Sequence, residues 1–505
     1  MLILNQEQLK FADRYTIEHE PIPSVDLMER ASERCIPELL SHIKTDVIVF
    51  CGKGNNGGDG LAITRLLLKK GYTCKAVVIH QSENFSADAE TNYKRLKEVN
   101  TAAVVDITDE HQLSDIIFHQ DTLIIDAIFG TGLNKALNGL SESAVNYINS
   151  SGCRIISIDC PSGLFIDKEN SSADIIVHSS LTLTFQYPKL SFLFAQNEKF
   201  VPAFKILDIG LHKDIDALIS PQNVFVTSRL IRQILTKRKA FSHKGTFGHA
   251  LLIAGSEHMK GAALLSAKSC LKSGAGLATL HSIKSVLDSL TVYLPEAITS
   301  EDSGENHITE LPPLDKFSSI GIGPGIGTHY NTELVLKKLM HYHNGTPLVM
   351  DADALNILSE NKTWLSFLPA ESILTPHPRE FDRLTEKHSS DMERLKSAKY
   401  FAAKYNCILV LKGAYTAICM PDGSCYFNGS GNAGLAKGGS GDVLTGVICG
   451  LLARGYSAPK SALIGVFIHG YAADLAVKTT SMESLLANDV IDRLGEAFQQ
   501  LESEY

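Results

Sequence analysis

The sequence contains little that would stabilise a small secreted protein or span a membrane. Its 505 residues include only ten cysteines and one tryptophan, and no two cysteines have the CxxC spacing of a structural zinc site. Cysteines this sparse exclude a disulfide framework and suit a reducing compartment. No apolar run approaches the roughly 18–20 residues that cross a bilayer. The chain turns polar after position 4, so we expect no signal peptide and a soluble, cytoplasmic protein.

An excess of positive charge is also missing. Lys and Arg total 47 against 56 acidic residues, which gives a formal net charge of −9. A nucleic-acid partner requires a basic surface that neutralises phosphates, and the basic cluster at 237–239 is short. We therefore expect neither nucleic acid nor a membrane as a partner. The 44% hydrophobic content is typical of a folded chain, and the length indicates two or three domains.

What is present is an alternation of short apolar runs with helical stretches, in two series. Runs at 47–50, 76–79, 123–125 and 155–158 are continuous and β-branched, which is typical of parallel strands covered on both faces. Residues 5–42 are predicted to be helical, with an interruption at 21–23. The pattern weakens over 210–245, and a second series follows at 249–254, 320–322, 347–350, 372–375 and 408–411. The sequence predicts an α/β protein with two domains, 1–222 and 223–505.

Three polar, glycine-rich segments follow strands of the first series. The first is GKGNNGGDG at 52–60, the second holds Asp126 and Gly-Thr-Gly at 130–132, and the third holds Asp159 and Pro-Ser-Gly at 161–163. Ligands of open α/β sheets bind beyond the carboxyl ends of the strands, so we expect these segments to converge on one crevice. Either Asp alone could cap a helix or form a turn. Their combination with the glycine turns favours a binding site.

This combination, preceded by Pro23, Ser24 and residues 27–29, resembles the epimerase domain of NAD(P)H-hydrate repair enzymes over about residues 5–215. The resemblance implies a Rossmann-like three-layer α/β/α fold with Asp159 as the catalytic acid–base group. It implies that the hydrated nicotinamide nucleotide contacts Asn55, Asn56, Gly57, Gly58, Asp59, Gly130, Thr131, Gly132, Leu133, Asn134, Lys135, Ala136 and Asp159. It also implies a potassium ion held by Asn56, Asp126 and Ser162, since oxygen ligands suit a hard cation.

The second series carries its strongest signal at 429–446, which reads GSGNAGLAKGGSGDVLTG. A glycine-rich loop that leads into an apolar helix can bind polyphosphate through its backbone amides. Asp442 at the helix start could take a proton from a substrate hydroxyl. It could instead only cap the helix, but the number of glycines favours a site. Further polar turns follow strands at 321–327, 351–355, 375–380 and 412–416.

Residues 226–500 resemble the ribokinase-like superfamily, and more closely its ADP- or ATP-dependent NAD(P)H-hydrate dehydratases, through HKGTFGHALLIAGS, DADAL, TPHPRE and KGAYT besides the loop above. The resemblance implies a ribokinase-like α/β/α fold with Asp442 as catalytic base and substrate contacts at Ala262, Gly327, His377 and Asp442. It implies an adenine-nucleotide site at Lys412, Gly413, Ala414, Tyr415, Thr416, Asn432, Ala433, Gly434, Leu435, Ala436, Lys437, Gly438, Gly439, Ser440 and Gly441. Arg379 and Lys437 depart from the family patterns TPHPGE and GNPGMATGGTGD, which bears on loop detail and nucleotide preference.

The two resemblances together imply a bifunctional enzyme that repairs hydrated NADH and NADPH. Residues 1–222 would interconvert the R and S hydrates with K⁺. Residues 223–505 would phosphorylate the S hydrate with Mg²⁺ and ADP or ATP, and then release phosphate, with AMP as the second product when ADP is the donor. We expect ADP as the donor and a homo-oligomer. The alternative is a ribokinase-like small-molecule kinase fused to a non-catalytic nucleotide-binding module, since such folds carry unrelated functions.

Overall fold

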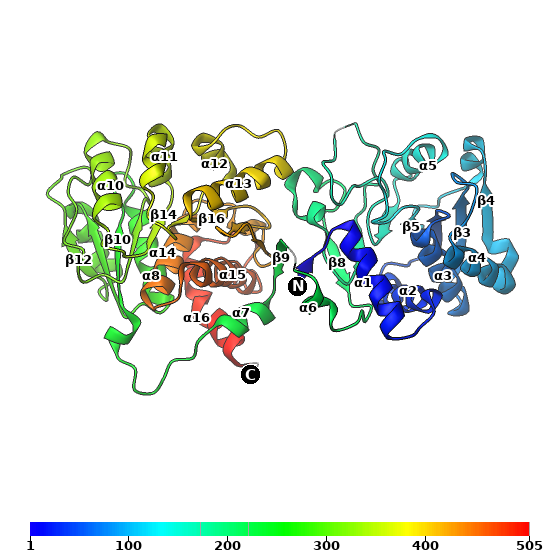
Figure 1. Cartoon of the computed structure of the whole chain (residues 1–505), viewed down its shortest axis with the longest axis horizontal. Coiled ribbons are helices and arrows are strands. Elements are labelled where there is room, and N and C mark those ends of the chain that lie inside the picture. Colours follow the sequence, from blue (N-terminus) through cyan, green and yellow to red (C-terminus); the bar gives the residue numbers. More distant parts are fainter. Residues whose placement is uncertain (172, 221, 504–505) are drawn as a thin grey trace. The chain divides into compact units, whose positions relative to one another are not determined.

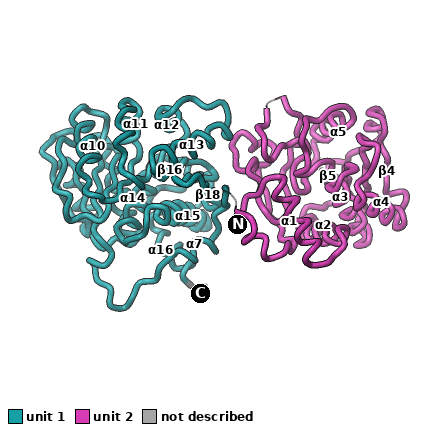
Figure 2. The backbone as a smooth tube through the Cα atoms, in the orientation of Figure 1, with its two compact units in different colours: residues 1, 222–505 teal, residues 2–221 magenta. Residues whose placement is uncertain are grey.

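The computed structural model describes residues 1–171, 173–220 and 222–503. It divides into two compact units, which we call the N-terminal unit (residues 2–221, magenta in Figure 2) and the C-terminal unit (residues 222–505 with Met1, teal). Both units are α/β with largely parallel sheets, which confirms the predicted fold class. Within the described residues, no helix is both long and apolar enough to cross a membrane.

In the N-terminal unit, the short strand β1 and two helices precede an alternation of strands and helices (Figure 1). Its strands are β1 (Leu2–Ile3), β2 (Asp46–Cys51), β3 (Thr73–Ile79), β4 (Val104–Ile107), β5 (Leu123–Ala127), β6 (Arg154–Ile158), β7 (Leu181–Phe185) and β8 (Phe204–Leu207). Its α-helices are α1 (Gln6–His19), α2 (Ser24–Leu40), α3 (Asn55–Lys69), α4 (Ala87–Asn100), α5 (Gly139–Ser150) and α6 (Ile215–Leu218).

Seven of these strands form a parallel sheet in the order β4-β3-β2-β5-β6-β7-β8. Alternate residues of β2 face opposite layers: Val47 and Val49 pack with apolar residues of α2, α3 and α4, whereas Ile48 and Phe50 pack with those of α5. Figure 1 accordingly shows α5 on one side of the sheet and α2 to α4 on the other. The chain reverses its direction of travel across the sheet between β2 and β5, which makes their carboxyl ends the expected ligand-binding crevice.

The C-terminal unit repeats this architecture with a longer sheet. Its strands are β9 (Asn223–Val226), β10 (His249–Ile253), β11 (Leu277–Ser282), β12 (Ile298–Glu301), β13 (Ser319–Ile322), β14 (Leu348–Met350), β15 (Ile373–Leu374), β16 (Ile408–Leu411), β17 (Ala417–Cys419) and β18 (Cys425–Asn428). Its α-helices are α7 (Ser228–Ile234), α8 (Lys260–Lys272), α9 (Lys284–Tyr293), α10 (Tyr330–Tyr342), α11 (Asp353–Glu360), α12 (Pro378–Leu384), α13 (Asp391–Tyr405), α14 (Ser440–Ala453), α15 (Ala458–Ala476) and α16 (Ala487–Ser503).

These strands run in the order β9-β18-β17-β16-β15-β14-β13-β10-β11-β12, and only β17 is antiparallel to its neighbours among the pairs in this order. In Figure 1, α10 to α13 lie on one side of the sheet and α8, α14, α15 and α16 on the other. Helix α14 is apolar almost all round because it lies in the core between α8, α15 and the sheet. Its buried position fixes the residues of its first turn.

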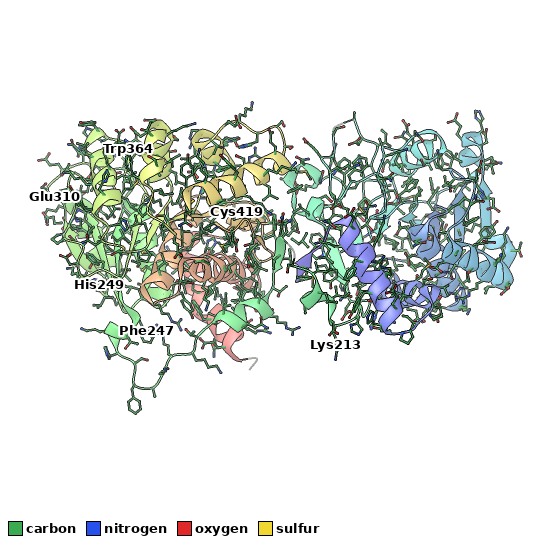
Figure 3. The ribbon with its side chains drawn as sticks, in the orientation of Figure 1. Lys213, Phe247, His249, Glu310, Trp364 and Cys419 are labelled. Carbon is green, nitrogen blue, oxygen red and sulfur yellow. The ribbon has the colours of Figure 1, made fainter. Side chains whose placement is uncertain are left out.

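The ten cysteines are all free, and nine of them are buried. Cys419 on β17 and Cys425 on β18 face each other with their sulfurs 3.5 Å apart and form no disulfide bond (Figure 3 labels Cys419). The cysteines are therefore mostly core side chains, as free thiols commonly are.

Candidate active sites

Helix α3 begins at Asn55, so the predicted substrate-binding residues 55–59 lie in its first turns and not in a loop. The preceding turn is tight: the Gly52 N–H donates to the Ala127 carbonyl at 3.1 Å, and a Cβ at Gly57 would lie 1.8 Å from the Gly52 carbonyl oxygen. The Asn56 side chain is buried, and neither atom of its amide has a hydrogen-bond partner in the described chain. Because burying an unpaired amide is costly, this position is suited to a ligand.

Gly130 brings the second predicted segment against the first. A Cβ at Gly130 would lie 3.1 Å from Asn56 Oδ1, so a larger residue here would crowd the Asn56 side chain. The following residues, 131–136, form irregular chain that is largely exposed. Lys168 Nζ donates to the Asn134 carbonyl at 3.1 Å. Residues 130–136 therefore begin beside the unpaired Asn56 amide, and most of residues 131–136 are exposed to solvent.

Asp126 and Ser162 form a buried pair at the ends of β5 and β6. Ser162 donates to Asp126 from its backbone N–H at 2.8 Å and from its hydroxyl at 2.5 Å, and the Ser157 hydroxyl donates at 2.8 Å. Burial raises the pKa of Asp126, and the hydrogen bonds from Ser162 and Ser157 oppose that shift. The Phe129 N–H donates to Ser162 Oγ at 2.8 Å. Since Phe129 precedes Gly130, these contacts join all three predicted segments at one edge of the sheet.

Asp159 directly follows β6 with a backbone φ of +62°. A non-glycine residue in this region costs roughly 1–3 kcal/mol, and such strain is concentrated at functional sites. The Lys189 ammonium lies 3.0 Å from Asp159 Oδ1, and its side chain is only 1% exposed. Lys189 also donates to the carbonyls of Phe185, at 3.2 Å, and Tyr187, at 3.0 Å, so all three ammonium protons have acceptors.

Two further carboxyl groups lie near Asp159. Asp59 is buried on α3, where the Ser32 hydroxyl donates to it at 3.3 Å. Burial and the charge of Asp159 raise the pKa of Asp59 well above its ordinary value. Asp13 on α1 is exposed as a residue, yet the dense protein around it and the Asp159 charge raise its pKa to about 7, with Lys189 opposing the shift. The sequence predicted neither Asp13 nor Lys189.

In the C-terminal unit, Gly439 is the N-cap of α14, with a φ of +92°, and Asp442 is the third helical residue. The capping alternative for Asp442 is therefore wrong. Burial and the charges of Asp351 and Asp353 raise the pKa of Asp442 to about 6, and Lys412 opposes the shift. A carboxylate with a pKa close to neutrality that is still largely ionised at pH 7 suits a general base.

Two side chains fix the glycine-rich loop before α14. Asn432 Nδ2 donates to Asp474 Oδ1 at 2.9 Å, and the Gly431 N–H donates to Oδ2 of the same carboxylate at 2.8 Å. The Lys437 ammonium donates to the Glu483 carbonyl. Lys437, which departs from the family pattern, thus anchors one end of the loop to the Glu483 carbonyl. Asn432 anchors the other end through its side-chain amide, which donates to Asp474.

Asp351 is the centre of a buried polar network below Asp442. Lys412 Nζ donates to Asp351 Oδ1 at 2.9 Å, and the Thr445 hydroxyl donates to Oδ2 at 2.8 Å. Glu380 Oε2 lies 3.9 Å from Lys412 Nζ. Burial would lower the pKa of Lys412, but the charges of Asp351 and Glu380 outweigh it and raise the pKa. Lys412 is therefore a cation fixed between two carboxylates.

His377 is the N-cap of α12, between two prolines. Its Nδ1 accepts from the backbone N–H groups of Arg379 at 3.1 Å and Glu380 at 3.3 Å. The backbone N–H of His377 donates to Glu380 Oε2 at 2.7 Å. Burial and the Lys412 charge lower the pKa of His377. The neutral ring with Nδ1 as acceptor carries its proton on Nε2, 3.5 Å from Glu380 Oε1. Arg379 itself is exposed.

The remaining predicted residues lie around the same strand ends. The Gly327 N–H donates to Asp353 Oδ2 at 2.9 Å. Ala262 on α8 is buried, and a Cβ at Gly325 would lie 3.2 Å from its methyl group. The Lys412 N–H donates to the Pro376 carbonyl at 2.9 Å, which places the 412–416 segment beside the His377 loop. These contacts connect both predicted binding segments to the Asp351 network.

Three residues of this network were not among the predicted site residues. Asp351 and Glu380 lie in motifs that the sequence marks, DADAL and TPHPRE, and position after a strand is the signal that points to them. Thr445 lies one turn into α14, where the sequence reads only as a buried helix. Its contact with Asp351 depends on tertiary packing.

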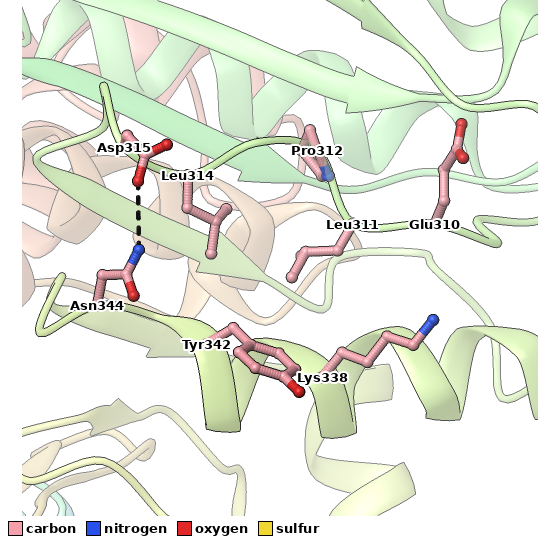
Figure 4. A pocket seen from close by; sticks show the side chains of 8 residues that line it. All are labelled: Glu310, Leu311, Pro312, Leu314, Asp315, Lys338, Tyr342 and Asn344. Carbon is pink, nitrogen blue, oxygen red and sulfur yellow. Dashed lines mark hydrogen bonds between the residues drawn. The ribbon is translucent and has the colours of Figure 1, made fainter.

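A separate hollow of about 410 Å³ lies between residues 310–315 and α10 (Figure 4). Glu310, Asp315, Lys338 and Tyr342 are among its lining residues, and Asn344 Nδ2 donates to Asp315 Oδ1 at 3.4 Å. No predicted site residue lines this hollow. Among the described residues, no group of three or more His, Cys, Asp or Glu side chains is arranged to hold a metal ion.

Comparisons with known proteins match both units. The family model described as "YjeF-related protein N-terminus" matches residues 24–191, and the one described as "NAD(P)H-hydrate dehydratase" matches residues 250–495. A ribokinase-like superfamily protein from Enterococcus faecalis, a solved structure, is 25% identical with a TM-score of 0.50, and the match covers 56% of this chain and 98% of that one.

Two curated relatives extend over the whole chain. The bifunctional NAD(P)H-hydrate repair enzyme Nnr of Moorella thermoacetica is 33% identical, and the match covers 100% of this chain and 98% of the relative. The enzyme of the same name from Thermofilum pendens is also 33% identical, with the same coverage. The chain belongs to the family of bifunctional NAD(P)H-hydrate repair enzymes.

Proposed function

We propose that the N-terminal unit interconverts the R and S hydrates of NADH and NADPH at the strand ends that carry Asp159. Family membership supports the reaction, and the strained backbone and ion pair of Asp159 support its role as the acid–base group. Residues 55–59 and 130–136 would bind the nucleotide. Asn56 would form part of this contact because its buried amide has no protein partner in the described chain.

Potassium fits the oxygen-rich junction of the three segments. The proposed ligands Asn56, Asp126 and Ser162 offer amide, carboxylate and hydroxyl oxygens, which are the donors that hard cations prefer. The Asn56 amide is unpaired, so a cation there would satisfy its oxygen. When bound, potassium would supply positive charge next to the nucleotide phosphates, while Ser162 and Asp126 keep the loops after β5 and β6 together.

In the C-terminal unit, we place dehydration of the S hydrate at Asp442. Asp442 would take the proton of the substrate hydroxyl as that oxygen attacks the terminal phosphoryl group of the nucleotide. The amides of the loop before α14 would stabilise the transferring phosphoryl group. Phosphate would then leave with its electron pair while the ring nitrogen donates electrons and the neighbouring carbon loses a proton, which restores NADH or NADPH.

Magnesium also fits this site. It commonly binds through one or two carboxylates together with substrate phosphates, and Asp351 and Asp353 are close enough to Asp442 to raise its pKa. When bound, it would neutralise charge on the phosphates. Residues 412–416 and 432–441 would bind the adenine nucleotide, with ADP as the donor and AMP and phosphate as products. Ala262, Gly327 and His377 would contact the hydrated cofactor. We also retain a homo-oligomer and a reducing, cytoplasmic location as proposals.

The observation that carries the dehydratase assignment is the position of Asp442: it is a carboxylate with a raised pKa inside the first turn of α14, not its cap. The alternative of a kinase that forms a stable phosphorylated product is tested by the products. A dehydratase releases phosphate and restores the absorbance of the reduced nicotinamide, whereas a kinase leaves phosphate on its substrate. Phosphorylated substrate that accumulates without NADH would overturn the assignment.

A further inference from the structure

Helix α15 contacts the start of the glycine-rich loop before α14 (residues 429–439) through one face. Phe467, Gly470 and Asp474 are spaced by three and four residues, so they lie on the same side of the helix. A Cβ at Gly470 would lie 2.5 Å from Ser430 Oγ, and the Ser430 hydroxyl donates to the Phe467 carbonyl at 2.8 Å. The chain at Ser430 therefore lies directly on α15.

Asp474 holds the next residues of the loop. Its Oδ2 accepts from the Gly431 N–H at 2.8 Å, and its Oδ1 accepts from Asn432 Nδ2 at 2.9 Å. The carboxamide oxygen of Asn432 in turn accepts from the Gly434 N–H at 3.1 Å, in the short turn Ala433–Leu435. One carboxylate thus fixes the direction of the chain from Gly431 to Gly434.

The far end of the loop meets the same helix. Ser440, the first residue of α14, has its Oγ 3.4 Å from Nε2 of His469, which is buried on α15. Helices α14 and α15 share the apolar core of the C-terminal unit and lie next to each other in Figure 1. Because this packing fixes α15, the helix supports both ends of the loop rigidly.

The chemistry of Asp474 suits a support for the loop and not a direct contact with phosphate. A carboxylate repels the negative phosphate oxygens of a nucleotide. Both oxygens of Asp474 also accept from the loop already. Backbone amides bind an anion most tightly when they are oriented before it arrives, since the cost of ordering the loop is then not subtracted from the affinity.

We infer that Asp474 is a positioning residue of the C-terminal unit: through Gly431 and Asn432 it holds the glycine-rich loop in the form that receives the nucleotide. It thereby sets the affinity for the nucleotide and not that for the hydrated cofactor. This inference rests on the proposed function, which assigns residues 432–441 to the adenine nucleotide. The family resemblance assigned no role to Asp474.

The test uses the full chain with Mg²⁺ and the S hydrate of NADH, and follows the absorbance of reduced nicotinamide while ADP or ATP is varied. Asp474→Asn keeps the size of the side chain and one oxygen for Gly431, but its amide group cannot accept from Asn432. The KM for the nucleotide should rise about tenfold, with kcat and the KM for the S hydrate within about twofold of wild type. Calorimetric titration with ADP alone should show the same loss of affinity.

Asp474→Ala removes both acceptors and should raise the nucleotide KM further. The KM separates this role from a merely structural one. A chain that is only less stable has fewer folded molecules, which lowers the apparent kcat but leaves the KM of the folded molecules unchanged. Asp492→Asn is the matched control, because Asp492 is exposed on α16, where it pairs with Lys268 at 3.0 Å. It should leave kcat and both KM values unchanged.

Asn432→Ala tests whether Asp474 acts through Asn432. In that background the Asn432 amide is absent, while Asp474→Asn still offers an oxygen to Gly431. The second substitution should therefore change the nucleotide KM by less than about twofold. The same rise of about tenfold in both backgrounds would mean that Asp474 does not act through Asn432, and it would overturn the inference.

A folded Asp474→Asn with a nucleotide KM and ADP affinity within about twofold of wild type would also overturn the inference, as would a variant that loses only kcat. An equal rise in the KM for the S hydrate would show a general distortion of the site and would overturn it too. If Asp474→Ala does not fold, Asp474→Asn decides. A wild-type chain that binds ADP but restores no NADH would instead contradict the proposed dehydration, and calorimetry would still test Asp474.

Discussion

The Lys412 ammonium lies 2.9 Å from Asp351 Oδ1, and the other oxygen of that carboxylate accepts the Thr445 hydroxyl from α14. This ion pair connects the ends of β14 and β16 to the helix that carries Asp442. Asp351 is almost completely buried, so water screens its charge poorly. Burial of Asp442 and, after it, the charge of Asp351 raise the pKa of Asp442 to about 6.

Asp351→Asn should therefore shift the pH dependence of dehydration to lower pH. The wild-type rate falls as the pH drops through about 6, where Asp442 takes up a proton. Removal of the Asp351 charge lowers the pKa of Asp442. The Lys412 charge, which the Asp351 carboxylate no longer neutralises, lowers it further. The measurement is kcat/KM for the S hydrate against pH. Asp288→Asn, on the exposed surface of α9, should keep the wild-type profile, and an unchanged or upward-shifted acid limb in Asp351→Asn would contradict this link.

Asp442→Asn should abolish dehydration and stabilise the C-terminal unit. Loss of a general base costs about 10²–10⁴-fold in rate. The pKa of Asp442 is raised in the folded state, so its ionisation at pH 7 opposes folding, and the amide removes about 1–3 kcal/mol of that cost. This gain should disappear as the pH falls below about 4, where the carboxyl is protonated in both states. Urea unfolding at pH 7 and below about pH 4 measures the free energy of unfolding, and calorimetric titration measures ADP binding. A variant that is less stable at pH 7 or no longer binds ADP would instead show that Asp442 has a structural role.

Potassium should raise the melting temperature of the N-terminal unit relative to lithium, by a few degrees at saturating salt, roughly as expected for a ligand that binds only the folded state. Asn56→Leu should remove this difference because the amide oxygen is lost while the Asp126–Ser162 pair stays intact. Asn84→Leu, an exposed change, should keep it. An equal potassium response in Asn56→Leu would exclude Asn56 as a ligand.

Gly57→Ala should destabilise the N-terminal unit by about 3 kcal/mol or more, because the new methyl group would meet the Gly52 carbonyl and the turn before α3 would have to open. Gly54→Ala in the same segment places its methyl group in open space and should change stability far less. Thermal unfolding of both variants compares them. Equal melting temperatures would mean that the glycines serve only the ligand and not the turn.

The periodicity of the sequence predicted the strands that carry the sites. Continuous apolar runs corresponded to β2, β5 and β6 and, in the C-terminal unit, to β10 and β13 to β16. It missed β17 and β18, which are short and are stabilised by pairing across a hairpin more than by their own composition. It also placed residues 55–59 in a loop, because glycine and asparagine usually end helices, whereas tertiary packing around Gly57 favours the helix here.

The positions of the predicted site residues could be predicted from the sequence where a motif follows a strand. Asp126, Asp159 and Ser162 lie where the rule of strand carboxyl ends puts them. Thr445 lies on a helix that reaches the Asp351 network only through packing, so no local pattern marks it. Lys189 also follows a strand, but no glycines accompany it in the sequence, and its ion pair with Asp159 becomes visible only in the folded chain.

We propose that one chain repairs both epimers, with each unit catalysing one step. The most direct measurement gives the full chain a mixture of R and S hydrates of NADH with Mg²⁺, K⁺ and either ADP or ATP, and follows the absorbance of reduced nicotinamide. We expect fast, nucleotide-dependent recovery of the whole pool in the wild type. In Asp159→Ala, only the S fraction should recover at the fast rate. Fast recovery that stops at one epimer in the wild type would contradict the epimerase assignment, and no recovery with either nucleotide would contradict the dehydratase.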